Sequence, residues 1–278
     1  MARSRGGYQY KIPRCGLSGD VVYTSLLGGF RLIKIYGGTD RGRVRATNQD
    51  TYAYKVVDEE TAFAIVCDGM GGEKGGHVAS AKAAEVIGQA LTRGLTPQLP
   101  AGSVKSLLIS AAAAANAVVY EMGCRDESLD GMGTTVIAVV VKGDLLCAIH
   151  AGDSRLYLFE NDGENPGAAQ RLTRDHSVVQ LLIDSGEISE QEARNHPKRN
   201  YITRALGVER STEVEYTERA FRKGQLLLCS DGLYNYAPPE EHAALITTCT
   251  SEQDLFLLID EANKAGGADN ITAVIVAK

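Results

Sequence analysis

The sequence predicts a domain of the α+β class, in which groups of strands are separated by paired helices. Strand-like runs with alternating apolar residues follow one another through short connections, which is typical of antiparallel hairpins. Helical stripes occur in pairs rather than singly after each strand, which argues against a doubly wound parallel sheet. The chain has 278 residues, of which 44% are hydrophobic and 23% are charged. This size and composition allow a full core and exclude collagen-like, coiled-coil and wholly disordered classes.

The chain divides into an arm and one domain. Residues 1–31 combine clustered glycines and basic residues without a sustained period, so we expect an N-terminal arm of uncertain order. Residues 32–278 contain no internal repeat and no linker, and they form the single predicted domain. This domain opens with strands at residues 32–36, 51–57 and 61–67.

Two long helices that face the core are predicted next. Residues 76–93 carry apolar side chains on one face at the helical period, from Ala79 and Ala83 to Leu91. Residues 103–122 repeat this stripe, and their alanine-rich centre adds high intrinsic helix propensity.

The rest of the domain mixes strands with shorter helices. Strand patterns at residues 134–141, 145–150 and 156–160 precede a glycine-rich loop at 161–168. A helix at 178–184 ends at Gly186, and Ser189 with Glu192 three residues later predicts a capping box that starts another short helix. The remaining elements are strands at 212–218 and 226–229, helices at 238–248 and 251–264, and a strand at 271–276.

Charge and cysteine usage narrow the class of protein. The 29 Lys and Arg against 35 Asp and Glu give a formal charge of −6, which argues against a surface built to hold nucleic acid. No C-x-x-C pair occurs, and Cys67, Cys147 and Cys229 lie in apolar runs, so we expect reduced thiols in the core. No apolar stretch approaches the roughly 18–20 residues of a membrane span, and no secretory signal is evident, so the expected location is the cytoplasm.

Aspartates stand at the ends of separate apolar strands. Asp68-Gly69 follows one strand, Asp231-Gly232 follows another, and Asp269 immediately precedes the last. A lone Asp-Gly after a strand is usually a hairpin turn, but this repetition weakens that interpretation. Carboxylates that converge repel each other unless a hard cation offsets their charge. Because the histidines show no zinc-ligand spacing, oxygen ligation of Mg²⁺ or Mn²⁺ is the predicted chemistry.

At this point the sequence resembles the metal-dependent type 2C (PPM) protein serine/threonine phosphatases, specifically their bacterial branch. The resemblance spans residues 32–278 and rests on motifs in a fixed order. They are residues 39–42 with Arg45, 48–50, 68–72, 131–135, 151–155, 172–177, 230–233 and 269–272.

The resemblance implies a fold and a set of metal ligands. The fold is a four-layer α-β-β-α sandwich, with two antiparallel sheets flanked by helix pairs and a metal cleft at one end. The residue matching Asp68 would bridge two metal ions, the carbonyl of Gly69 would bind one, and Asp231 and Asp269 would bind the other. A third ion would use Asp130 together with Asp231. The implied cofactors are therefore Mn²⁺ or Mg²⁺, two ions in the central site and a third beside it.

The resemblance also implies a mechanism. A water bridging two cations would attack phosphorus in line, without a phosphoenzyme, and the metals would offset charge on the phosphoryl oxygens. Arg45 matches a phosphate-binding arginine, whose planar fork suits two phosphoryl oxygens. Asp50 and Asp153 match groups that hydrogen-bond metal-bound water, although a turn explains Asp153 equally well. Residues 177–200 correspond to a flap beside the cleft.

Two departures leave an alternative open. Gln49 stands where the family usually has Glu, so one acceptor for metal-bound water is neutral and metal affinity is expected to fall. Met70 stands where animal relatives have a histidine thought to protonate the leaving alkoxide, which leaves that acid unassigned. The main hypothesis is a phosphatase acting on phosphoserine and phosphothreonine in proteins, a monomer that opposes a Hanks-type kinase in bacterial signalling. The alternatives are a phosphatase-like binding or sensor module weakened by Gln49 and, on generic two-metal grounds only, a phosphodiesterase or nuclease.

Overall fold

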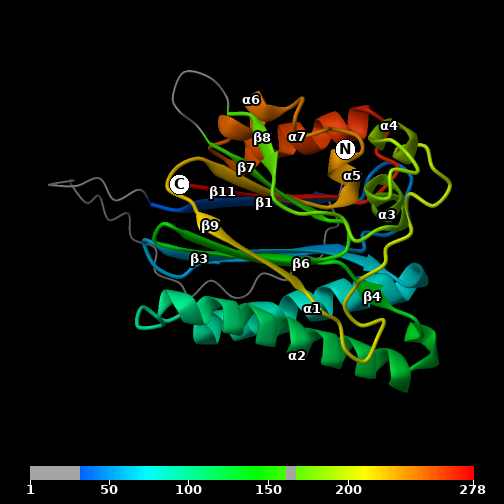
Figure 1. Ribbon diagram of the computed structural model, residues 1–278, viewed down its shortest axis with the longest axis horizontal. Helices are drawn as coiled ribbons and strands as arrows, with labels where there is room; N and C mark the ends of the chain where they lie inside the picture. The colour runs from blue at the N-terminus through cyan, green and yellow to red at the C-terminus, as the bar shows by residue number, and fades with distance from the viewer. Residues whose placement is uncertain (1–31, 161–166) are drawn as a thin grey trace, which may run out of the picture.

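Strands that are apolar on both faces form the centre of the molecule. The computed structural model describes residues 32–160 and 167–278, which are arranged as two antiparallel sheets packed face to face with helices on both outer sides (Figure 1). The predicted α+β sandwich of two antiparallel sheets is therefore confirmed. The predicted arm at residues 1–31 and most of the glycine-rich loop lie outside the described residues.

One sheet lies against the two long helices. Its strand order is β2-β3-β5-β6-β9, and a short β4 continues the pairing at the end of β3. The bounds are β2 (Asp50–Val56), β3 (Thr61–Met70), β4 (Gly133–Thr134), β5 (Val136–Lys142), β6 (Leu145–Ala151) and β9 (Glu215–Ala220). Helices α1 (Gly72–Gly94) and α2 (Val104–Arg125) cover its outer face (Figure 1), and short 3-10 turns flank α2 as η1 (Ala101–Ser103) and η2 (Glu127–Leu129).

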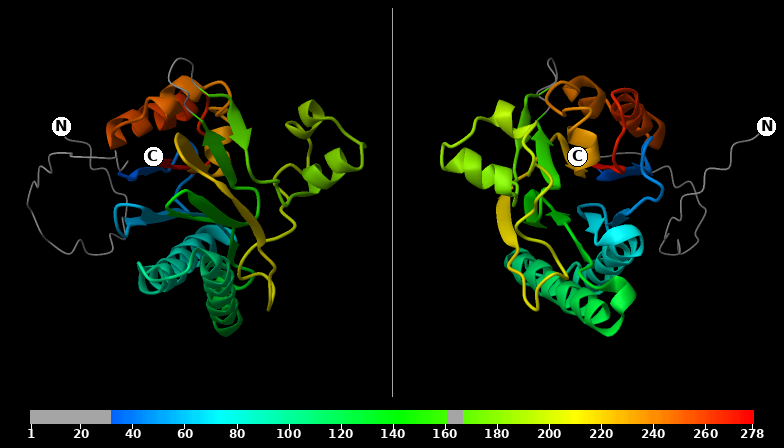
Figure 2. Two further views of the ribbon diagram at one scale, coloured as in Figure 1. Left: turned by 60° about the vertical axis from the view of Figure 1, so that its left-hand side comes forward. Right: turned by 90° about the vertical axis from the view of Figure 1, so that its right-hand side faces the viewer.

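The other sheet joins the first and last described strands. Its order is β1-β11-β10-β7-β8, with β1 (Lys34–Asp40), β11 (Ile271–Ala277), β10 (Gln225–Cys229), β7 (Arg155–Phe159) and β8 (Ala169–Arg171). Helices α5 (Asp231–Tyr234), α6 (Ala243–Thr247) and α7 (Glu252–Lys264) lie on its outer side. Helices α3 (Val178–Asp184) and α4 (Glu190–Ala193) instead stand off from the layers in a segment of their own (Figure 2).

Alternation along the central strands produces three separate cores. In β3, Phe63 and Ile65 pack toward α1 and α2, whereas Ala64 and Val66 pack toward the other sheet. Strands β10 and β11 alternate in the same way between the inter-sheet core and the core under α5, α6 and α7. Burying one such large apolar side chain stabilises the fold by about 1.5–3 kcal/mol, which is why a strand buried on both faces reads as a continuous apolar run.

Most predicted elements are present, with shifted ends. Helix α1 begins at Gly72 rather than residue 76, because Gly71 adopts φ 115° and turns the chain directly into the helix. Strand β3 continues to Met70, since Gly69 and Met70 pair with β4. The helix predicted at 238–248 is reduced to α6, whereas the capping box of Ser189 and Glu192 is confirmed.

Helix α2 corrects one expectation from the sequence. Within the described residues, the segment Ala101–Arg125 is long and apolar enough to cross a membrane by length and composition, contrary to the expectation that no stretch comes near this. Its buried side, including Val104, Leu108 and Val119, packs into the core beside α1. This packing makes α2 a core helix of the fold.

The described cysteines agree with the expectation of unpaired thiols. All five of them are free, and Cys67, Cys147 and Cys229 are buried in strands. Cys15 lies outside the described residues.

Candidate active site

Two aspartates face the gap between the sheets at one end of β2 and β3. Asp50 and Asp68 are directly opposite each other in the antiparallel register. Asp68 lies two residues beyond Val66, which packs toward the other sheet, so the period of two places Asp68 on that same face. The sequence pattern therefore folds a buried apolar strand whose last inward position is a carboxylate.

The opposite sheet contributes two more carboxylates at the same end. The backbone N–H of Ser230 donates to Thr272 O at 3.1 Å, so the end of β10 lies beside the start of β11. Asp231 comes directly after Ser230, and Asp269 comes two residues before Ile271. The three strand-end aspartates noted in the sequence are thus brought together from two sheets.

Hydrogen bonds across the gap hold the two groups in place. Ser230 Oγ donates to Asp50 Oδ2 at 2.6 Å, and the backbone N–H of Gln49 donates to Asn270 Oδ1 at 2.8 Å. The amide of Asn270 also donates to the carbonyls of Arg41 and Thr47, each at 2.9 Å. Asn270 therefore ties the loop after β1 to the start of β11.

The electrostatics of the cluster are those of crowded, poorly solvated anions. Burial and then the charge of Asp50 raise the pKa of Asp68 well above its ordinary value. Burial and then Asp153 raise the pKa of Asp231 in the same way, while Arg45 opposes the change. Burial raises the pKa of Asp50 to about 7, although the hydrogen bond from Ser230 lowers it. These carboxylates are unfavourable as anions unless a positive charge joins them.

Unsatisfied oxygens show that the cluster fits a hard cation. Asp231 Oδ1 and Asp50 Oδ1 are buried and have no hydrogen-bond partner. Buried polar atoms normally have one, and carboxylate oxygens without donors are the ligands that Mg²⁺ and Mn²⁺ prefer. The backbone at Gly69 is packed too closely to admit a side chain, because a Cβ there would lie 1.9 Å from Gly76 O. The residues present are therefore suited to divalent metal ions.

Arg45 lies at the mouth of the cluster. Its Nη2 donates to Asp269 Oδ2 at 2.7 Å, and its side chain is 51% exposed. That hydrogen bond is the main reason why the pKa of Arg45 is raised. Half of the Arg45 side chain is thus exposed, which leaves it accessible to a second anionic partner.

Gln49 and Asp153 support the cluster from its two sides. The Gln49 carbonyl accepts hydrogen bonds from Gly69 N at 3.2 Å and from Ser80 Oγ at 2.6 Å, so this residue braces the turn into α1. Asp153 is buried, and burial followed by the charge of Asp175 raises its pKa to about 6. Its charge acts in turn on Asp68 and Asp231, which places it beside them.

Asp130 and the predicted flap lie outside the hydrogen-bond network of this cluster, as far as the described residues show. Asp130 is exposed in the turn between η2 and β4, and no hydrogen bond or ion pair in the described residues joins its side chain to Asp231. Residues 177–200 contain α3 and α4 and project from the sandwich on the side of α5 (Figure 2).

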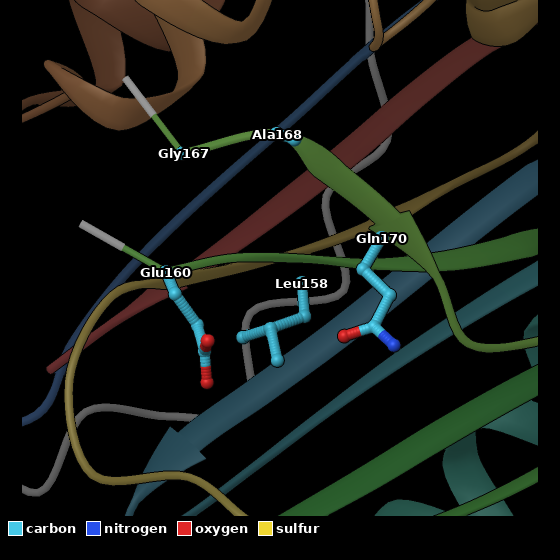
Figure 3. A pocket seen from close by; sticks show the side chains of 5 residues that line it. All are labelled: Leu158, Glu160, Gly167, Ala168 and Gln170. Carbon is cyan, nitrogen blue, oxygen red and sulfur yellow. The ribbon is translucent and has the colours of Figure 1, made fainter. Parts of the chain in front are cut away.

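Two further features are separate from the aspartate cluster. His150, His176 and Glu215 can bring ligand atoms within 4.8 Å of one another, and none of them was among the predicted ligands. A pocket beside β7 and β8 is lined by Leu158, Glu160, Gly167, Ala168 and Gln170 (Figure 3). No predicted site residue lines this pocket.

Reasoning from the sequence missed the residues that hold the aspartates in place. Ser230, Asn270 and Thr135 were quoted only as members of motifs, yet Thr135 Oγ1 accepts a hydrogen bond from Asp68 N at 3.0 Å. All three are buried polar residues. Their signal in the sequence is a polar side chain adjoining an apolar strand that has an aspartate at its end.

Comparison with known proteins agrees with this geometry. Residues 37–255 match a family model described as protein phosphatase 2C. The chain is 37% identical over 242 residues to the serine/threonine phosphatase stp of Listeria innocua, which covers 86% of this chain and 93% of that protein. It is 36% identical over 238 residues to the serine/threonine protein phosphatase PstP of Mycobacterium tuberculosis, covering 85% of this chain and 43% of that longer protein.

Solved structures agree with the fold as well. The serine/threonine phosphatase of S. agalactiae superposes with a TM-score of 0.79 at 31% identity, covering 88% of this chain and 99% of that one. The Mycobacterium tuberculosis phosphatase PstP/Ppp gives a TM-score of 0.76 at 34% identity, over 88% of this chain and 98% of that one.

Proposed function

The chain belongs to the protein phosphatase 2C family and is a protein serine/threonine phosphatase, and on that premise we propose that it hydrolyses phosphoserine and phosphothreonine using Mn²⁺ or Mg²⁺. One observation carries the metal dependence. Asp68 from one sheet meets Asp231 and Asp269 from the other, and Oδ1 of Asp231 is buried without a donor, as is Oδ1 of the neighbouring Asp50. At neutral pH the charge of such a cluster is offset by bound cations or by protonation of its carboxylates.

We assign the metal ligands as follows. Asp68 and the carbonyl of Gly69 would hold one ion, Asp68 with Asp231 and Asp269 would hold another, and Asp130 with Asp231 would hold a third. Bound in this way, the metals supply positive charge to the phosphoryl oxygens and lower the pKa of water at the site. The carbonyl of Gly69 is suited to this role because a backbone carbonyl adds a ligand oxygen without adding another negative charge.

The protein groups around the metals bind the phosphate and hold water. Arg45 would exchange its contact with Asp269 for two phosphoryl oxygens, since its side chain is half exposed and its guanidinium is planar and always charged. Asp153 and Asp50 would accept hydrogen bonds from water in the site, because both are buried carboxylates beside the ligands. Gln49 would keep the turn from β3 into α1 in register through its backbone and side chain.

The substrates proposed are phosphorylated proteins. The similar proteins of Listeria and Mycobacterium are named serine/threonine phosphatases. We extend that activity to this chain, acting as a monomer in the cytoplasm and opposing a Hanks-type kinase in bacterial signalling. The acidic balance of the sequence is consistent with a protein rather than a nucleic-acid substrate.

The alternative hypothesis is a phosphatase-like binding or sensor module in which Gln49 weakens metal binding. The side-chain amide of Gln49 donates to Gly72 O at 2.6 Å, which a carboxylate cannot do. This hydrogen bond explains in structural terms why a glutamine stands at this position. Gln49 therefore does not favour the binding module over the enzyme.

The decisive experiment measures hydrolysis of a phosphothreonine peptide with Mn²⁺, with Mg²⁺ and with EDTA. We expect turnover with a divalent metal, none in EDTA, and none after Asp231→Ala. Asp260→Ala serves as the matched control, because Asp260 is exposed on α7. Turnover that persists in EDTA, or that is unchanged in Asp231→Ala, would show that the metal assignment is wrong.

A further inference from the structure

We propose that Asp175 and His176, at the base of the flap, are positioning residues for Asp153. The inference deepens the proposed function and rests on it, because Asp153 is there assigned to hold water beside the metals. Neither residue contacts the aspartate ligands through a hydrogen bond or ion pair in the described part of the chain. Both belong to sequence motifs that the proposed catalytic chemistry leaves unused.

His176 binds the residue before Asp153 twice. Its backbone N–H donates to Gly152 O at 2.8 Å, and the backbone N–H of Gly152 donates to His176 Nδ1 at 3.2 Å. Gly152 adopts φ 110°, and a Cβ there would lie 2.6 Å from the side chain of Thr135. The conformation that sends Asp153 into the site is therefore fixed from both sides of Gly152.

The hydrogen bonds assign one tautomer to His176. Since Nδ1 accepts from Gly152, the one hydrogen of the neutral ring is on Nε2, which donates to Glu215 Oε2 at 3.2 Å. Arg204 Nη1 also lies 3.2 Å from Nε2, but a guanidinium can only donate, so its contact with this nitrogen is electrostatic and not a hydrogen bond. The ring of His150 stacks on it at 4.3 Å, and burial followed by the charges of His150 and Arg204 lowers the pKa of His176 to about 4. The ring is neutral and oriented at ordinary pH.

The same tautomer argues against a metal ion between His150, His176 and Glu215. A metal ion on His176 Nε2 would need the lone pair there and would move the hydrogen to Nδ1. That hydrogen would then face the N–H of Gly152, a donor opposite a donor. The nearness of the three side chains is better explained by orientation of the ring.

Asp175 acts on Asp153 through two intermediate residues, the cationic Arg155 and the aromatic Tyr234. Its carboxylate accepts hydrogen bonds from Arg155 Nη2 at 2.7 Å and from Arg155 Nε at 3.1 and 3.2 Å. The guanidinium lies 3.6 Å from the ring centre of Tyr234, whose hydroxyl donates to Asp153 O at 3.1 Å. Because Tyr234 lies in α5, which begins at Asp231, this chain of contacts fixes Asp153 relative to Asp231.

His176 also closes the base of the flap. Its carbonyl accepts from Thr203 N at 2.8 Å, and the next residue, Ser177, forms an isolated bridge with Ile202. His176 thus forms hydrogen bonds both with Thr203, just after the C-terminal end of the flap, and with Gly152 in the turn that carries Asp153. Flap position and water orientation are therefore linked through His176.

Variants of His176 separate its two side-chain contacts. His176→Asn retains an acceptor in the place of Nδ1, whereas His176→Gln retains a donor in the place of Nε2 and loses the acceptor for Gly152. Calorimetry with Mn²⁺ should show affinity about tenfold weaker in His176→Gln and near that of the parent in His176→Asn, as for other groups that orient metal-site residues. The KM for a phosphothreonine peptide at saturating Mn²⁺ should be unchanged. His242→Gln is the control, since the His242 side chain hydrogen-bonds only Pro238 O among the described residues.

Amide hydrogen exchange keeps the positioning role separate from the proposed function. In the metal-free protein, a peptide covering residues 150–156 should exchange faster in His176→Gln and in Tyr234→Phe than in the parent. Unchanged exchange in both would overturn the positioning role, and so would parental Mn²⁺ affinity in a folded His176→Gln. If His176→Gln does not fold, Tyr234→Phe decides, because it removes only the hydroxyl that bonds Asp153. A parent that binds no Mn²⁺ but shows the exchange difference would refute the proposed function and leave the positioning role standing.

Discussion

The side-chain amide of Gln49 donates a hydrogen bond to the backbone carbonyl of Gly72, 2.6 Å away. Gly72 is the first residue of α1 and has φ 74°, so this bond fixes the glycine turn between β3 and the helix. The turn follows Gly69, whose carbonyl is a proposed metal ligand. In the sequence, Gln49 is notable as the loss of a carboxylate, but in the structure its side chain supports the backbone turn that follows Gly69.

Gln49→Glu should lower stability without raising activity. A carboxylate cannot donate to Gly72 O, so we expect a loss of about 1 kcal/mol in the free energy of unfolding. Urea denaturation and turnover of a phosphothreonine peptide in Mn²⁺ measure the two effects, with the exposed Gln253→Glu as control. A higher kcat/KM in Gln49→Glu would show instead that the missing carboxylate limits catalysis.

The stability of the metal-free protein should fall as pH rises. The pKa values of Asp68 and Asp231 are raised by burial, so their protonated forms favour folding. The stability they contribute is complete below their ordinary pKa of about 4 and is lost as the pH rises through their raised values. In EDTA at pH 8, Asp231→Asn should therefore be more stable than the parent.

Thermal denaturation across pH 4 to 8 in EDTA tests this expectation, with Asp260→Asn as control. The difference between Asp231→Asn and the parent should vanish near pH 4, where the carboxylates are protonated. Mn²⁺ should reverse the order at pH 8, because a ligand that binds only the folded parent adds to its stability. Equal stability of the two proteins in EDTA at every pH would contradict the electrostatic description of the cluster.

Arg45→Lys should impair catalysis far more than folding. Lysine keeps the charge but loses the planar fork, so we expect kcat/KM to fall at least about tenfold, or 1.4 kcal/mol. The ion pair with Asp269 is half exposed and contributes less than about 1 kcal/mol to stability. Steady-state kinetics with a phosphopeptide distinguish these effects, and Arg93→Lys in the last turn of α1 is the matched control. Full activity in Arg45→Lys would mean that only its charge is used.

Two glycines should respond in opposite directions to alanine. Gly69→Ala places a Cβ 1.9 Å from Gly76 O, so it should cost about 1–3 kcal/mol or more and abolish Mn²⁺ binding. Gly88→Ala in the middle of α1 meets only Ile65 Cδ1 at 3.8 Å and should stabilise the protein by about 0.5–1 kcal/mol. Chemical denaturation of both variants provides the comparison. A Gly69→Ala protein that binds Mn²⁺ like the parent would exclude a tight backbone at this ligand.

The sequence predicted the carboxylates but not what holds them. An aspartate that ends an apolar strand is a local pattern, and Asp68, Asp231 and Asp269 all follow it. The bond from Ser230 to Asp50 joins residues 180 positions apart, and the path from Asp175 through Arg155 to Tyr234 joins separate elements. Periodicity carries no information on such pairs, because it describes the face of an element and not its neighbour. Strand ends were misjudged for the same reason, since β4 extends β3 only through tertiary pairing.

The pairing of β1 with β11 bears on how the protein is made. Asp40 is opposite Ile271, so the pair formed by β11 and the edge strand β1 joins the two ends of the described chain. During translation β1 waits without this partner, and Asp269 has yet to emerge beside Arg45. Contacts this distant in sequence form late. We therefore expect a nascent chain to gain phosphatase activity only after β11 has emerged from the ribosome and paired with β1.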